Sequence, residues 1–144
     1  MRKKTRRTAN RILTWVISLL GFSTSCNLLP EVEYGTPHAT FRVNGTVRSA
    51  ESGEVIPNIR VVMEYDSTQT DAEGKYALAV EDWPDDQTFA IQFLDTDGAT
   101  NGSFANVDTS VVFTDPQFTG GDGHWNEGSV ETEFNIDLPD EAGR

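Results

Sequence analysis

The sequence predicts an all-β protein, an antiparallel two-sheet sandwich over residues 39–138. Apolar and polar residues alternate with a period of two in six short segments, as in strands that bury one face and expose the other. Residues that favour turns (Gly, Pro, Asp and Asn) separate these segments. After residue 30, no long segment has the 3.6-residue period of an amphipathic helix. Short strands at this spacing favour two stacked sheets.

The six predicted strands each contribute one apolar face. In chain order, the alternating residues are Phe41, Val43, Gly45 and Val47; Ile59, Val61, Met63 and Tyr65; Tyr76, Leu78 and Val80; Phe89, Ile91 and Phe93; Val107, Val111 and Phe113; and Val130, Thr132, Phe134, Ile136 and Leu138. Two sheets that pack these faces together bury enough apolar surface for independent folding. Residues 139–144 are expected to form a flexible C-terminal tail.

The first 25 residues differ in kind from the rest. Six of the eleven basic residues precede the apolar run Ile12–Phe22, and no acidic residue occurs before Glu31. Small residues, Ser23 to Ser25, then lead to Cys26. This order predicts a secretory signal helix over residues 1–25. The apolar run is about half of the roughly 20 residues that span a bilayer, so an uncleaved single-pass anchor is the alternative.

Cys26 is the only cysteine, so no internal disulfide can form. Ser-Thr-Ser-Cys resembles the bacterial lipobox, although Ser23 replaces the usual Leu. The resemblance implies diacylglycerol on the sulfur of Cys26 and an acylated new amino terminus. Several acyl chains hold a protein on a membrane stably. By analogy with lipoprotein sorting in enteric bacteria, Asn27 favours the outer membrane. A chance thiol behind an ordinary signal is the alternative, and residues 26–38 are expected to form a lipidated tether.

The charge of the chain restricts its partners. The whole sequence carries −12, and removal of the signal leaves five basic against 23 acidic residues, a net charge of −18. Such a surface repels phosphate backbones, which argues against nucleic-acid binding. It also repels anionic headgroups, so contact with the bilayer is expected through the lipid on Cys26.

Three segments resemble the carboxypeptidase regulatory-like domain. They are Val43–Val47, Ser52–Val61 and Thr70–Tyr76. The resemblance implies a transthyretin-like or immunoglobulin-like β-sandwich and no particular activity. Tight turns at Gly53 and Gly74 suit this pattern, and Asp71 can accept a hydrogen bond from the backbone two residues on.

The mature chain also resembles a narrower family, the radical SAM-associated lipoproteins of anaerobic Gram-negative bacteria. The features that carry this resemblance are the signal ending at Cys26, the leader Tyr34–Pro37, the turn Thr70–Gly74 and the loop Asp95–Phe104. It implies a neighbouring gene for a radical S-adenosylmethionine enzyme, and it supplies no activity.

No catalytic constellation stands out in the sequence. A hydrolytic triad needs a nucleophile, a base and an orienting group. The only imidazoles are His38, in the predicted tether, and His124, in a glycine-rich loop, and the one thiol is expected to be lipidated. Two histidines so far apart also make a poor zinc site. We expect the protein not to be an enzyme.

Calcium is the one cofactor that the residues suggest. Asp95, Asp97 and Asn101 are oxygen donors spaced closely around Gly98, and calcium needs 6–8 oxygen ligands. Further ligands could come from Asp108 or Asp115. The spacing departs from the EF-hand pattern, and an Asp-Gly turn followed by an Asn-Gly turn explains the same residues. The sequence is therefore compatible with a calcium site and with a pair of turns.

The loop from Thr114 to Glu127 is the longest stretch of low periodicity in the predicted domain. Its Phe118, His124 and Trp125 could form a contact surface for a protein or glycan partner. Alternatively, Trp125 folds back over the core.

These observations favour a non-enzymatic, lipid-anchored binding or accessory module of the cell envelope. The alternative, which the family resemblance motivates, is a substrate that the neighbouring radical SAM enzyme modifies before export.

Overall fold

The computed structural model describes residues 35–141, which form strands and no helix. The strands are β1 (His38–Ser49), β2 (Ile59–Met63), β3 (Asp66–Gln69), β4 (Lys75–Asp82), β5 (Gln87–Asp95), β6 (Val107–Phe113), β7 (Thr119–Gly120), β8 (Asn126–Glu133) and β9 (Ile136–Leu138). The predicted signal helix over 1–25, the lipidation site Cys26 and most of the predicted tether lie outside the described residues. Among residues 35–141 there is no long apolar helix of the kind that crosses a membrane.

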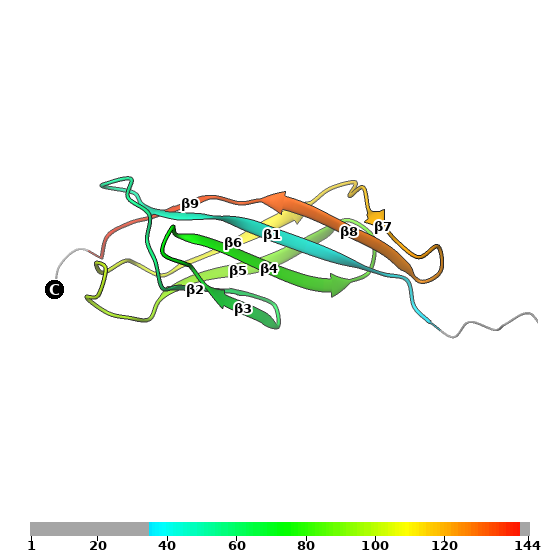
Figure 1. The fold of residues 1–144 in the computed structure, drawn as a ribbon, viewed down its shortest axis with the longest axis horizontal. Helices are drawn as coiled ribbons and strands as arrows, with labels where there is room; N and C mark the ends of the chain where they lie inside the picture. The colour runs from blue at the N-terminus through cyan, green and yellow to red at the C-terminus, as the bar shows by residue number, and fades with distance from the viewer. Residues whose placement is uncertain (1–34, 142–144) are drawn as a thin grey trace, which may run out of the picture. The chain divides into compact units, whose positions relative to one another are not determined.

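The strands form two sheets packed face to face, which confirms the predicted sandwich (Figure 1). One sheet has the order β4-β1-β8-β7, with β9 also paired to β1, and the other has the order β3-β2-β5-β6. All pairs are antiparallel except that β1 runs parallel to β8 and β9. The prediction of antiparallel sheets is therefore incomplete. Parallel pairing needs a long crossover, and here strands β2 to β7 intervene before the chain returns to β1.

The predicted alternation produces the core between the sheets. Along β1, Phe41 is fully buried whereas the next residue, Arg42, is exposed. The ring of Phe41 meets Phe89, Phe113 and Phe118 edge-on, with centroids 5.2, 5.1 and 5.4 Å away. Edge-on aromatic pairs add stabilisation beyond their buried area. Residues from both sheets thus interlock around one ring in the first half of β1.

Tyr65 does not continue the second strand, as its place in the alternation predicted. The chain reverses at Glu64, whose φ is +51°, and returns as β3 with Met63 opposite Asp66. The side chain of Tyr65 is 73% exposed. Its hydroxyl accepts a hydrogen bond from the amide of Glu81 at 2.7 Å and donates to the carbonyl of Glu81 at 3.0 Å. Because β3 is polar throughout, its period is invisible in the sequence.

The last predicted strand is interrupted at Phe134 and Asn135, which separate β8 from β9. The side-chain oxygen of Asn135 accepts the amide of Thr46 at 2.8 Å. The carbonyl of Phe134 turns toward β1 and accepts the hydroxyl of Tyr76 at 2.6 Å. At Gly45, an added Cβ would lie 1.9 Å from that carbonyl oxygen. The glycine thus permits a close backbone approach, and Phe134 is half-buried rather than fully buried as predicted.

The predicted turn chemistry of the regulatory-like segments is present in the structure. Gly53 and Gly74 have φ of +73° and +70°, in the left-handed region that glycine adopts without strain. The carboxylate of Asp71 accepts the amides of Glu73 and Lys75, each at 2.9 Å. These bonds fix the turn that delivers the chain into β4.

The sandwich has two ends with different loops (Figure 1). We call the end where β1 begins the tether end; it includes residues 35–37, 83–86 and 121–125. The opposite end, the far end, includes residues 50–58, 70–74, 96–106 and 139–141. At the far end, Pro139 accepts the amide of Ala105 at 2.9 Å, and Glu141 donates to Ser103 at 2.8 Å. The start of the predicted flexible tail is therefore hydrogen bonded to the domain.

Candidate functional site

The candidate calcium residues occupy one far-end loop that begins where β5 ends. Asp95 uses both carboxylate oxygens within this loop, since Oδ1 accepts the amide of Asp97 at 3.3 Å and Oδ2 accepts the amide of Phe104 at 2.8 Å. Oδ2 of Asp97 accepts the side-chain amide of Asn101 at 2.9 Å. Gly98 and Asn101 have φ of +68° and +65°. The structure brings the three predicted residues together in a pair of hydrogen-bonded turns.

The two further ligands considered for calcium do not join this loop. Asp108 accepts a hydrogen bond from Gln92 at 3.0 Å on the outer face of β5 and β6. Asp115 lies at the other end of β6, where its amide donates to Asp86 at 2.7 Å. Within residues 35–141, no three His, Cys, Asp or Glu side chains gather as a metal site would require. The described bonds favour the interpretation as turns, and calcium binding stays a prediction.

The aromatic residues of loop 114–127 pack onto the domain. Phe118 contacts Phe41 in the core. Trp125 is half-buried, and a Cβ on Gly35 would lie 2.4 Å from its ring. The carbonyl of Trp125 accepts the amide of His38 at 2.8 Å. Trp125 therefore covers the start of β1, in line with the second of the two interpretations given for this loop.

The two histidines lie on different segments of the domain. His124 is exposed, and its amide donates to Asp122 Oδ1 at 2.9 Å, a bond that lowers the pKa of the Asp122 carboxyl. His38 is the first residue of β1 rather than part of a tether. Its Nδ1 lies 3.2 Å from the carbonyl oxygen of Thr36 and donates to it, which leaves Nε2 outside this bond.

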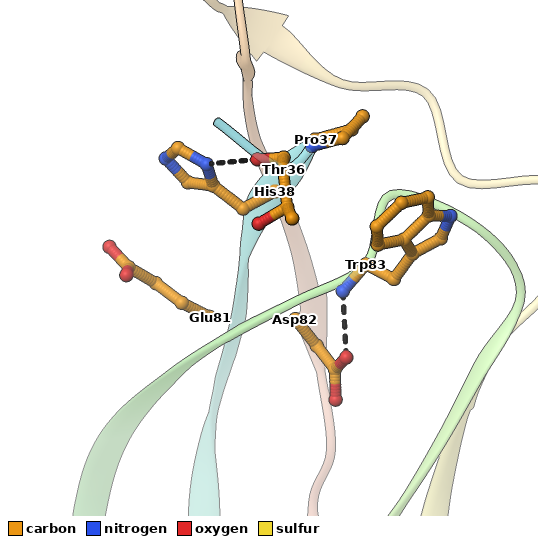
Figure 2. A pocket seen from close by; sticks show the side chains of 6 residues that line it. All are labelled: Thr36, Pro37, His38, Glu81, Asp82 and Trp83. Carbon is orange, nitrogen blue, oxygen red and sulfur yellow. Dashed lines mark hydrogen bonds between the residues drawn. The ribbon is translucent and has the colours of Figure 1, made fainter. Parts of the chain in front are cut away.

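A shallow hollow lies at the tether end, beside His38 (Figure 2). It has a volume of about 420 Å³ and is lined by Thr36, Pro37, His38, Glu81, Asp82 and Trp83. Residues 36–38 lead into β1, and residues 81–83 end the antiparallel partner strand β4. In Figure 2, the imidazole and the Glu81 carboxylate project on one side of the strands and the Trp83 ring on the other. We call these six residues the Trp83 pocket.

The Trp83 pocket combines an exposed aromatic ring with polar side chains. Trp83 is 52% exposed and offers an aromatic face. The His38 imidazole and the Glu81 carboxylate, on the other side of the strands from the ring (Figure 2), offer polar groups for hydrogen bonding. The alternation that predicted the strands does not single out Trp83. A large aromatic residue directly after a strand that ends in two acidic residues is a signal for this part of the pocket, but it does not reveal the neighbouring residues 36–38.

Comparison with known proteins adds no function. No protein-family model matches the chain, and no curated protein matches it.

Proposed function

We propose that the protein is a non-enzymatic, lipid-anchored binding or accessory module of the cell envelope, attached to the outer membrane through Cys26. The observation that carries the anchor is the order of basic residues, apolar run and small residues ending at the only cysteine. A sandwich that starts soon after this cysteine supports it, because β1 begins at His38.

The short distance along the chain limits where the sandwich can act. Nine residues of chain lead from Cys26 to Gly35, and an extended chain covers at most about 3.5 Å per residue. A lipid on Cys26 would therefore keep the tether end within roughly 30 Å of the bilayer. Anionic headgroups repel the acidic domain and add no binding energy, so the acyl chains alone hold the protein on the membrane.

The binding half of the proposal is supported by the Trp83 pocket. An aromatic side chain that is 52% exposed at the end of a strand is available to a partner, and aromatic residues are enriched where proteins bind one another. The hydroxyl of Thr36, which also lines the pocket, is a polar group that could orient a ligand.

Membrane fractionation with the Cys26→Ala variant tests the anchor. Wild-type protein should appear as a processed form in the membrane fraction, whereas Cys26→Ala should remain as an uncleaved precursor or a soluble form. Equal amounts of processed, membrane-bound protein from both would exclude lipidation at Cys26.

A comparison of wild type with Trp83→Ala tests the binding pocket. Cross-linking in native membranes, followed by purification, should recover a partner with wild type and lose it with Trp83→Ala. Recovery of the same partner at equal yield would exclude the Trp83 pocket as its binding site. Recovery of no partner with wild type would count against a binding role.

A second candidate function rests on the resemblance to lipoproteins encoded beside radical SAM enzymes. Here the protein is a substrate, and a residue is modified before export. An intact mass of the native protein separates the candidates, because a shift beyond signal removal and acylation supports modification. A mass explained by those two steps alone supports the binding module.

A further inference from the structure

Three of the exposed strand edges in the two sheets are short or blocked. The edge of β4 is covered by the β2–β3 turn, where the Asp66 carboxylate accepts the amide of Ala79 at 2.9 Å and the Tyr65 hydroxyl bonds to both backbone groups of Glu81. At the other edges of the sandwich, β3 has four residues and β7 has two. Proteins shorten or cover edges in these ways because unpaired backbone groups recruit other strands.

The edge of β6 is long and open. This strand has seven residues, ends its sheet and pairs with β5 alone. It contains neither proline nor lysine, which commonly protect an edge, and Asp108 is its one charged residue. Asp108, Ser110 and Val112 are exposed on its outer face, and Val112 is 60% exposed. Among residues 35–141, the edge of β8 is covered by β7 at Gly128 and Ser129 and carries the exposed Glu131 and Glu133 beyond them, whereas β6 is open along its whole length.

The register shows which backbone groups of β6 are free. The amide of Asp95 points toward the β6 side, where it donates to the side chain of Asn106 at 3.0 Å. Backbone groups alternate along a strand, so Phe93 points the same way and pairs with Val107. By the same alternation, the N–H and C=O groups of Asp108, Ser110 and Val112 point away from β5.

The face beside this edge carries little charge. The outward residues of β5 next to it, Thr88, Ala90 and Gln92, are exposed and uncharged. Asp108 is the one acidic residue of β6, and it accepts a hydrogen bond from Gln92. Other acidic residues lie in the end loops, such as Glu51 and Asp97 at the far end, and on strands of the other sheet, such as Glu131 on β8. A second surface can therefore approach β6 without bringing many carboxylates together.

We infer that β6 pairs with β6 of a second copy of this chain, antiparallel and centred on Ser110. This register pairs all seven residues, because Val107 lies opposite Phe113 and Ser110 lies opposite itself. It also places each Asp108 opposite Val112 of the second copy, which avoids the destabilising pairing of like charges. The inference rests on the edge and goes beyond the proposed membrane anchor.

Disulfide trapping of a Ser110→Cys variant tests the pairing in the full-length protein extracted with detergent. Cα atoms of a hydrogen-bonded antiparallel pair lie about 5.5 Å apart, within the range for a disulfide. Mild oxidation should give a covalent dimer on a non-reducing gel. Wild-type protein shows how much dimer forms through Cys26. The Ser67→Cys variant, with its cysteine on the exposed face of β3, shows how much forms by random collision. Dimer formation by Ser110→Cys at the level of Ser67→Cys would overturn the inference and leave the edge to a strand of another protein.

Charge changes at Val112 test the register itself in the Ser110→Cys background. Val112→Lys would face Asp108 of the second copy and should raise dimer yield by about threefold, whereas Val112→Glu should lower it by about threefold. Both residues are exposed in the monomer, so the two variants should fold alike. Ser67→Lys and Ser67→Glu control for net charge. Equal yields for the two Val112 variants would refute the Ser110-centred register.

The salt dependence of disulfide trapping shows whether a second acidic copy or a basic partner strand pairs with β6. Two copies of net charge −18 repel each other, so added salt should increase trapping of the Ser110→Cys variant. A decrease with salt would contradict pairing of two acidic copies and would point to a basic partner strand.

Discussion

Gly45→Ala is the sharpest test of how the two halves of the interrupted strand join β1. The new Cβ would lie 1.9 Å from the carbonyl oxygen of Phe134 and 2.6 Å from its carbonyl carbon. Contact distances near 3.5 Å are favourable, so the backbones must separate by about 1.5 Å. Phe134 resists this movement, because its amide donates to Asn44 at 2.7 Å and its carbonyl accepts Tyr76 at 2.6 Å.

The expected cost of Gly45→Ala follows from these contacts. Overpacking typically costs 1–3 kcal/mol, and weakening two hydrogen bonds adds about 1 kcal/mol each. Alanine also lowers the conformational entropy of the unfolded chain, which stabilises the fold by about 0.5–1 kcal/mol. We expect the free energy of unfolding to fall by about 3 kcal/mol, which lowers the Tm of a domain of this size by more than 10 °C.

Urea and thermal unfolding of residues 35–144 measure this cost. Gly53→Ala is the matched control, because its φ is +73° but nothing lies within 4 Å of the new Cβ. It should cost only the 1–2 kcal/mol of a left-handed alanine. Tyr76→Phe should reduce the additional cost of Gly45→Ala, since both act on the same carbonyl. If Gly45→Ala costs no more than Gly53→Ala, the close approach is refuted.

Three further outcomes are expected. Phe134→Ala should lower the free energy of unfolding in urea by about 2 kcal/mol, less than the 3–5 kcal/mol of a fully buried phenylalanine. The reason is that the ring is half-buried and stacks on Phe93, with the ring centroids 6.3 Å apart. A loss above 4 kcal/mol would contradict this expectation. Burial raises the pKa of Tyr76, so the buried neutral hydroxyl stabilises the fold below about pH 10 and this stabilisation is lost as the pH rises further. The free energy of unfolding should therefore decline at alkaline pH, and Tyr76→Phe should flatten this decline. An unchanged decline in Tyr76→Phe would show that Tyr76 is not its cause. Calcium and magnesium at matched ionic strength should raise the Tm equally, because the Asp95 and Asp97 oxygens serve the turns; a calcium-specific rise that Asp97→Asn abolishes would establish the calcium site.

Alternation predicted the strands well where one face is apolar and failed where that pattern is absent or misleading. Phe41 and Phe89 lie in the core as predicted. Tyr65 fits the pattern of the preceding strand, yet the chain turns at Glu64, a residue that seldom adopts positive φ. Periodicity also identifies strands without their partners, which is why the parallel pairing of β1 with β8 was not foreseen.

The candidate site shows a different limit. An aspartate that caps a turn and an aspartate that binds calcium need the same oxygen atoms, so Asp95 suits both in the sequence. In the structure, the oxygens of Asp95 accept the amides of Asp97 and Phe104, which is what a turn requires. The Trp83 pocket depends on the pairing of β1 with β4, which brings residues 36–38 beside residues 81–83. No local pattern in the sequence contains that juxtaposition.

The most direct test of the proposed anchor is the mass of the amino-terminal peptide of the protein purified from membranes. We predict that this peptide begins at Cys26 and carries a diacylglyceryl group on its sulfur together with an acyl group on its amino terminus. A peptide in which Cys26 has a free thiol, or a chain that retains residues 1–25, would contradict the account.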